Sequence, residues 1–294
     1  MIYPIKTNCK SEEKVYTKTG QCAAFENRPA GFIITDESKE FSLVEETFNT
    51  EIQSGVTAAG GNRIYPLLSG QVTDYQVNGG DVKTSQEGFG PEEPVGLNNK
   101  SVVYIINKGG LCLYRELKKL NGRTVRVIPV DINGIAFGTV KSNVAGVDKF
   151  CGFQATIWVT RRENTGSQQG AILFSVYFGS NYENEDSNFT TLQLAKLVEG
   201  LTGIALKKTT SGKAKVISAC SGDDLTETFG ADLAVAGLYV NSAGTAPSSV
   251  SYNTATQDLS FTPSSASYKL ADAQTLTAAG LEGVEGINEY VNLA

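Results

Sequence analysis

The sequence of 294 residues contains no histidine. Without an imidazole, Ser-His-Asp and Cys-His catalysis and the usual zinc and iron sites are excluded. Walker-type glycine loops and a strand–GxGxxG–helix unit are also missing. A carboxylate-pair hydrolase stays open in principle, but we interpret the candidate acidic residues as solvated loop carboxylates. They are Asp81, Glu87, Glu92, Glu93 and Asp131. We therefore predict no enzyme activity, no cofactor and no metal site.

Long apolar runs are also missing. No stretch of about 18 apolar residues could span a membrane, and the N-terminal segment MIYPIKTNCKSEEK has no apolar core of a secretory signal. Five cysteines are widely spaced, and no pair forms C-x-x-C. We expect reduced, structural thiols in a protein made in a cytoplasm. They are Cys9, Cys22, Cys112, Cys151 and Cys220.

What the chain does contain is typical of a folded β protein. Hydrophobic residues make up 40% and charged residues 19%, and 31 glycines accompany many Ser, Thr and Asn residues. This composition favours short strands joined by tight turns. The predicted class is mainly β (α+β). It comprises a β-sandwich or barrel domain with one or two flanking helices, plus a small C-terminal immunoglobulin-like β-sandwich.

Charge is distributed unevenly. From residue 223 onward there are nine carboxylates and one lysine, a net charge of −8, so the rest holds 31 − 9 = 22 acidic and 25 − 1 = 24 basic residues, a net charge of +2. This shift predicts a domain boundary near residue 222. We expect an N-terminal arm with the first strands of the large domain over 1–60, a β-sandwich core over 61–222, and an acidic module over 223–294.

Hydrophobic periodicity places the elements of the large domain. Leucine spacing predicts helices over 111–120 and 189–201, each followed by a glycine stop signal. Residues 153–159 alternate, with Phe153 and Ile157 on one face and Trp158 on the other. Pro129 suggests that its strand lies at an edge. Further strands and hairpins are expected over 31–36, 62–78, 101–110, 123–140, 150–163, 171–180 and 203–219.

A long polar loop over 78–100 interrupts these strands. Loops of this length inside a domain usually have a function, and subunit contact and ligand binding both remain open, with subunit contact favoured. The residues expected to make that contact are Gly79, Gly80, Asp81, Phe89, Pro91 and Pro94. A carbohydrate-binding surface would instead require an exposed aromatic platform. Its candidates are Trp158, Tyr177, Tyr182 and Tyr252, which we interpret as core residues.

The segments TSQEGFGPEEPVGLN (84–98) and GGLCLYRELKKLNGRTVRVIPVDINGIAFGT (109–139) resemble virion structural proteins of tailed bacteriophages, particularly those that infect gut Bacteroidota. The resemblance covers roughly residues 65–220. The order of elements is similar to that of the tail-tube family, in which six subunits form a ring, rings stack, and a long loop and an N-terminal arm bridge successive rings. An external immunoglobulin-like module is a known variation in that family.

The resemblance implies a non-enzymatic, self-assembling virion protein, made in the host cytoplasm. Its partners would be further copies of itself in stacked, hexameric rings, other virion proteins, and DNA that passes without specific binding. Residues 79–98 would bridge rings, and a DNA conduit should present carboxylates to the phosphates. Candidates for that lining are Glu12, Glu13, Glu45, Glu46, Glu92 and Glu93. The alternatives are a capsid decoration or neck protein, and a carbohydrate-binding surface adhesin.

Overall fold

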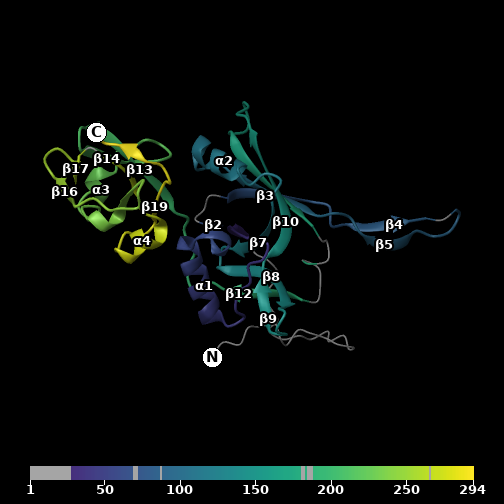
Figure 1. Ribbon diagram of the computed structural model, residues 1–294. Helices are drawn as coiled ribbons and strands as arrows, with labels where there is room; N and C mark the ends of the chain where they lie inside the picture. Colours follow the sequence, from purple (N-terminus) through teal and green to yellow (C-terminus); the bar gives the residue numbers. More distant parts are fainter. Residues whose placement is uncertain (1–27, 69–71, 87, 180–182, 184–187, 265) are drawn as a thin grey trace. The chain divides into compact units, whose positions relative to one another are not determined.

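The computed structural model describes residues 28–68, 72–86, 88–179, 183, 188–264 and 266–294. The chain divides into two compact units. One unit, here called the large unit, contains residues up to 56 and 60–199, and the other, the C-terminal unit, contains residues 57–59 and 200–294. Mainly β structure with a few helices confirms the predicted fold class (Figure 1).

The large unit is built on one curled sheet. Its strands follow the order β12-β8-β7-β10-β11-β6-β3, with β1 paired to β7 and β2, and β9 paired to β8. The bounds are β1 Pro29–Thr35, β2 Ile64–Leu67, β3 Val72–Asn78, β6 Ser101–Ile106, β7 Thr124–Asp131, β8 Ile135–Ser142, β9 Asp148–Cys151, β10 Phe153–Arg162, β11 Ala171–Phe178 and β12 Phe189–Gln193. Two further strands, β4 (Val82–Ser85) and β5 (Glu93–Leu97), pair with each other and with no other strand of the described residues.

One face of this sheet holds the main apolar core. On β10 the alternating residues Ala155, Ile157 and Val159 are buried, as the sequence pattern predicts, and they join Phe32 and Phe174 in one cluster. Helix α2 (Gly110–Lys118) lies against this cluster through its buried Leu117. The helix predicted over 111–120 is therefore confirmed. Its apolar stripe repeats at the spacing that covers a sheet face.

The opposite face is covered in part by helix α1 (Glu45–Thr57). Phe48 of this helix makes edge-to-face contacts with Phe41, at 5.6 Å between ring centroids, and with Phe150, at 5.2 Å. All three rings are fully buried. Edge-to-face pairs add stability beyond the apolar area that they bury.

The prediction of a helix over 189–201 is wrong. Residues 189–193 form β12, which pairs antiparallel with β8, and no helix is assigned over 194–201. Side chains of α1 hold this segment extended, because the Glu45 carboxylate accepts a hydrogen bond from Gln193 N at 2.9 Å and Asn49 Oδ1 accepts one from Ala195 N at 2.7 Å. These long-range contacts outweigh the helical spacing of the leucines.

Pro129 is also not at a sheet edge. Strand β7 pairs with β1 along its length, including Phe32 opposite Pro129. On its other side, pairing with β10 ends at Val127 and pairing with β8 is limited to Val130. The proline therefore lies in the gap between two ladders, where its missing N–H donor interrupts no strand pairing on that side.

A partly buried ionic cluster ties the chain at Glu183 to the sheet. The Glu183 carboxylate contacts Lys141 Nζ, lies 3.7 Å from the Arg126 guanidinium, and accepts a hydrogen bond from Gln154 N at 2.7 Å. Arg126 also donates to the carbonyl oxygens of Glu37 and Gly152. Burial opposes ionisation of Glu183, but the hydrogen bonds from Lys141 and Gln154 and the two positive charges lower its pKa overall.

We expect the substitution Glu183→Gln to reduce the free energy of unfolding by about 2 kcal/mol, because Arg126 loses its buried counter-charge but keeps its carbonyl partners. The matched control is Glu163→Gln, which removes an exposed pair with Arg161 and should change stability by less than about 0.5 kcal/mol. Urea unfolding of both variants measures the difference. Equal losses would contradict a structural role of the cluster.

The effect should depend on pH. The folded-state pKa of Glu183 lies below its ordinary value of 4.5, so its ionised form stabilises the fold above about pH 4.5, and this contribution is lost as the pH falls through the folded-state pKa. The stability gap between wild type and E183Q should be constant near neutral pH and should shrink under acidic conditions.

The C-terminal unit is a second β structure with its own core. Its strands are β13 Thr202–Thr210, β14 Lys213–Ser218, β15 Tyr239–Asn241, β16 Ser249–Asn253, β17 Asp258–Thr262, β18 Ser267–Leu270, β19 Val284–Gly286 and β20 Val291–Asn292. Two short helices, α3 (Thr226–Phe229) and α4 (Ala273–Ala278), lie between strands. One sheet has the order β16-β17-β14-β13-β19 and the other β15-β18-β20.

This arrangement is immunoglobulin-like. In that fold, strands A, B, E and D form one sheet and C, F and G the other. Here β13, β14, β17 and β16 take the places of A, B, E and D, and β15, β18 and β20 those of C, F and G. A tyrosine corner supports the assignment, because Tyr268 at the start of β18 donates its hydroxyl to the Pro263 carbonyl oxygen at 3.4 Å.

The unit begins at Gly200, and the boundary expected near residue 222 falls inside its first sheet. The hairpin of β13 and β14, expected to close the large domain, supplies strands A and B instead. The boundary inferred from the change in net charge at residue 223 is therefore misplaced. Residues 200–222 carry four lysines and no carboxylate, so the C-terminal unit has a net charge of −8 + 4 = −4.

The cysteine prediction is correct for only part of the described chain. Cys151 is a free, buried thiol, whereas Cys112 and Cys220 are disulfide-bonded. Cys112 lies on α2 off the stripe of Leu113 and Leu117, and Cys220 follows β14 in an exposed turn, so neither is enclosed by the core. Cys9 and Cys22 lie outside the described residues.

The boundary can be tested with fragments. A fragment of residues 200–294 contains every strand of both sheets of the C-terminal unit and should unfold cooperatively on its own. A fragment of residues 223–294 lacks β13 and β14, which exposes the buried Leu259 and Phe261 of β17, and should stay unfolded. Circular dichroism and amide NMR dispersion distinguish the two. A folded 223–294 fragment would contradict this division.

Candidate assembly surface

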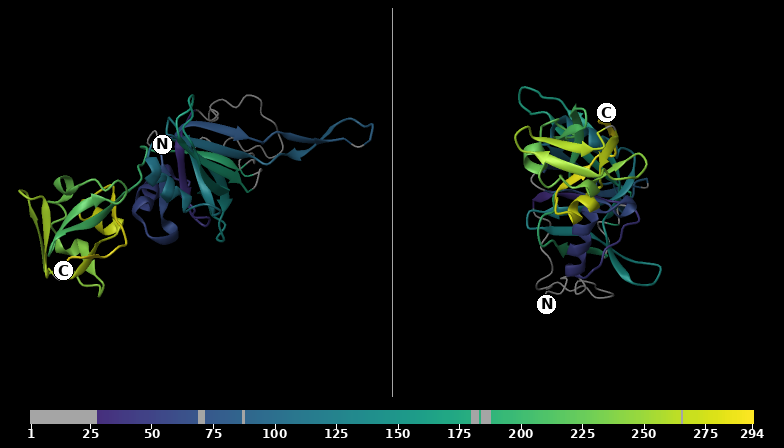
Figure 2. Two further views of the ribbon diagram at one scale, coloured as in Figure 1. Left: turned by 90° about the horizontal axis from the view of Figure 1, so that it is seen from above. Right: turned by 60° about the vertical axis from the view of Figure 1, so that its left-hand side comes forward.

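The loop predicted over 78–100 is a two-stranded ribbon. Strands β3 and β6 pair up to Asn78 and Ser101, and the chain continues into β4 and β5, which pair from Val82 and Leu97 outward. Figure 1 and the left view of Figure 2 show the ribbon projecting away from the rest of the large unit. The glycines and prolines indicated turns here, but the segment is polar and shows no apolar alternation that would have predicted two paired strands.

The base of the ribbon is closed by backbone geometry. Gly80 N donates to the Asn98 carbonyl oxygen at 3.2 Å, and Asn98 N donates to the Asp81 carbonyl oxygen at 2.9 Å. Gly79 has a φ of 73°, and a Cβ there would lie 1.8 Å from the Asn99 carbonyl oxygen. Only glycine fits this position, so the sequence fixes the point at which the ribbon leaves the sheet.

Apolar side chains along the ribbon are exposed to solvent. The exposed fractions are 58% for Val82, 57% for Val95 and complete for Phe89 near the tip. Of the expected contact residues, Gly79, Asp81, Phe89, Pro91 and Pro94 are exposed and Gly80 is half-buried. A two-stranded ribbon by itself is only marginally stable in water, and open strand edges promote pairing with another chain. The ribbon therefore has the properties of a docking element.

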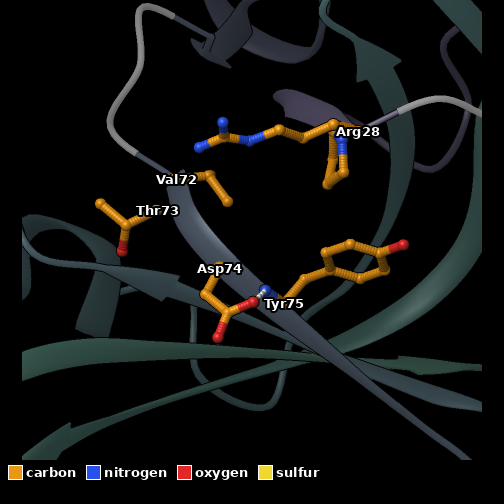
Figure 3. A pocket seen from close by; sticks show the side chains of 6 residues that line it. Arg28, Val72, Thr73, Asp74 and Tyr75 are labelled. Carbon is orange, nitrogen blue, oxygen red and sulfur yellow. Dashed lines mark hydrogen bonds between the residues drawn. The ribbon is translucent and has the colours of Figure 1, made fainter.

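The edge of the main sheet beside the ribbon is open as well. Strand β3 ends the strand order and pairs only with β6 among the described strands. Its residues from Thr73 onward are exposed on both faces. A shallow cavity of about 210 Å³ lies between this edge and the start of β1 (Figure 3). Its lining residues are Arg28, Pro29, Val72, Thr73, Asp74 and Tyr75.

This cavity is smaller than typical ligand pockets of about 300–1,000 Å³. Asp74 points beside its neighbour Tyr75 and accepts a hydrogen bond from Tyr75 N at 2.8 Å, as the dashed line in Figure 3 shows. We find no second carboxylate among the lining residues. Within the described part of the chain, no group of three or more acidic or cysteine side chains could hold a metal ion.

Among the described residues, the expected conduit carboxylates are not brought together. Glu45 is half-buried on α1 and holds Gln193, whereas Glu46 beside it is exposed. Glu92 and Glu93 are exposed on the ribbon, which lies at a different end of the large unit from α1 in Figures 1 and 2. Glu12 and Glu13 lie outside the described residues.

Two aromatic residues that we interpreted as core are exposed. Trp158 and Tyr177 each expose 50% of their surface, and they project from neighbouring strands of the sheet. Tyr252 packs partly buried against the core of the C-terminal unit, and Tyr182 lies outside the described residues. The alternation along β10 did place Trp158 opposite the core residues, so the sequence contained the signal that its interpretation missed.

The comparisons with protein families, curated proteins and solved structures found no match to this chain. In the described residues, no helix is long and apolar enough to cross a membrane. Function must therefore be argued from the ribbon, the open edge of β3 and the exposed aromatic residues.

The ribbon should be dispensable for folding. Replacing residues 81–97 by Asn-Gly joins the paired residues Gly80 and Asn98 through a favourable two-residue turn. No described residue of the replaced segment is buried, so the free energy of unfolding should change by less than about 1 kcal/mol. Thermal unfolding followed by circular dichroism measures this. Loss of cooperative unfolding would show that the ribbon belongs to the folding unit.

Proposed function

We propose that this chain is a non-enzymatic, self-assembling virion structural protein, most specifically a tail-tube subunit of a tailed bacteriophage that forms a conduit for DNA. The observation that carries the proposal is the ribbon of β4 and β5, which projects from the sheet with exposed Val82, Phe89 and Val95. Burying an exposed apolar side chain such as Phe89 against a partner is favourable, so its position at the ribbon tip suits a contact site.

Three further features support self-assembly. The ribbon leaves the sheet at its open edge, so a neighbouring copy can add to that edge or to the ribbon itself. The immunoglobulin-like unit has a core of its own and is an addition to the large unit. The resemblance of residues 84–98 and 109–139 to phage virion proteins covers most of the ribbon, together with α2, β7 and the first part of β8.

The proposal includes a ring of copies, with six as the number implied by the resemblance, and stacking of rings through the ribbon. The protein would then reside in the virion and contact other virion proteins. The carboxylates on the ribbon, Glu92 and Glu93, stay candidates for a surface near passing DNA, because negative charge repels phosphate. Glu45 is a poorer candidate, since its carboxylate is already bonded to Gln193.

The test compares the wild-type protein with the variant that has residues 81–97 replaced by Asn-Gly. Negative-stain electron microscopy at low and high concentration should show rings or tubes with a central channel for wild type and monomers for the variant. A matched control is Val144→Ser, because Val144 is as exposed as Phe89 but lies in the turn between β8 and β9. Wild-type protein that stays monomeric at every concentration would sink the proposal, and so would tubes formed equally well without the ribbon.

A carbohydrate-binding adhesin is the second candidate, favoured by the exposure of Trp158 and Tyr177. Flat aromatic faces stack against the apolar faces of sugar rings. A glycan array probed with wild type and with the variant Trp158→Ser tests this function. Binding that depends on Trp158 would favour the adhesin, and absence of binding to every glycan would remove it.

A further inference from the structure

The outer face of the sheet is covered over only part of its width. Helix α1 covers the part near β9 through Phe48, but on β10 and β11 the same face presents half-exposed Trp158 and Tyr177. Trp158 lies opposite Ser175, and Tyr177 lies opposite Thr156, so the two aromatic rings are diagonal neighbours. We call this surface the Trp158 face. Its members are Ser101, Val103, Thr156, Trp158, Leu173, Ser175 and Tyr177.

This face is an apolar surface of a kind that partners cover. Val103 and Leu173 are half-buried and extend the apolar area of Trp158 across three neighbouring strands. Trp158 is the only tryptophan of the chain. Aromatic residues with one face exposed are enriched at protein interfaces, where a few of them supply most of the binding energy.

Positive charge gathers around the same end of the sheet. The turn after α2 packs beside Trp158, because Gly122 N donates to the Ile157 carbonyl oxygen at 2.9 Å and a Cβ at Gly122 would lie 3.9 Å from the indole ring. Residues 119–123, which form this turn, and 160–163, which follow Trp158 on the chain, carry four cations and one carboxylate, a net charge of 4 − 1 = +3. The cations are Lys119, Arg123, Arg161 and Arg162.

The ribbon carries the complementary properties. Residues 78–98 hold four carboxylates and one lysine, a net charge of 1 − 4 = −3, and Phe89 stands fully exposed near the tip. The four residues of β4 alone carry the ribbon about 13 Å outward from its base. The acidic, apolar ribbon and the basic, aromatic face thus belong to different parts of one unit. Such a pair of unlike surfaces generates rings or filaments of identical copies.

We propose that the Phe89-bearing tip of the ribbon in one copy binds the Trp158 face of a second copy, with the ribbon's carboxylates facing the arginines and the lysine around Trp158. This inference rests on the proposed self-assembly and assigns the receiving surface for it. Phe89 would cover Trp158 and Tyr177, and complementary charge would set the orientation.

A complementation experiment separates the donor from the acceptor. The donor-deficient variant has residues 81–97 replaced by Asn-Gly, and the acceptor-deficient variants are Trp158→Ser and Tyr177→Ser. At the concentration at which the wild-type protein assembles, neither class should assemble alone. A mixture of the two should form a one-to-one dimer by light scattering, because the intact ribbon of one meets the intact face of the other.

The controls use matched exposure. Tyr65→Ser removes an aromatic residue that is 48% exposed on β2, away from the Trp158 face, and should assemble as wild type does. Trp158→Ser should raise the concentration needed for assembly about tenfold or more. High salt should weaken the mixed dimer, because part of the attraction is between exposed charges.

The outcomes distinguish this inference from the proposed function. If Trp158→Ser and Tyr177→Ser assemble as wild type does while the ribbon-less variant fails, the acceptor assignment is overturned and self-assembly stands. Normal assembly of Trp158→Ser together with loss of its binding to a glycan array would overturn it in favour of a carbohydrate ligand. A wild-type protein that never assembles removes both.

Discussion

Burial of β1 on both faces is the constraint on which the large unit depends. Every residue of this strand is buried, and Phe32 enters the cluster beneath α2 while β1 pairs with both β7 and β2. A strand buried on both faces requires packing partners on each side. On one side Phe32 packs on Tyr104 and Phe174 across the curled sheet. Neither α1 nor α2 covers the whole sheet. The helices leave β3 with its ribbon and the outer face of β10 and β11 uncovered. These are the surfaces that we assign to contacts with other copies.

Strand alternation could be predicted from sequence with good results, because its period of two is local. Along β10 the pattern separated Ile157 from Trp158 correctly. It could not say whether the second face was covered, since that depends on how far α1 extends over the sheet. The same limit applies to residues 189–201, whose leucine spacing indicates a helix, while the deciding contacts come from Glu45 and Asn49, more than a hundred residues away.

Topology also decided the division of the chain. Charge changes sharply at residue 223, but strand pairing defines the unit. The lysine-rich strands β14 and β13 lie in the middle of its first sheet, between β17 and β19. The position of the candidate site in the chain could be predicted from the sequence, but its structure as a paired ribbon could not. Glycines and prolines marked residues 78–100, whereas the ribbon pairing of Val82 with Leu97 and the distance of Glu45 from Glu92 follow from the folded backbone.

The free thiol of Cys151 has a consequence for the kinetics of the fold. It lies on β9 opposite Thr139, and burial raises its pKa, so the neutral form persists in the closed structure. Thiol reagents react with the thiolate, and here its exposure requires β9 to separate from β8 and from Phe41, which bridges to it. The rate at which this sulfur is labelled therefore measures local opening at β9.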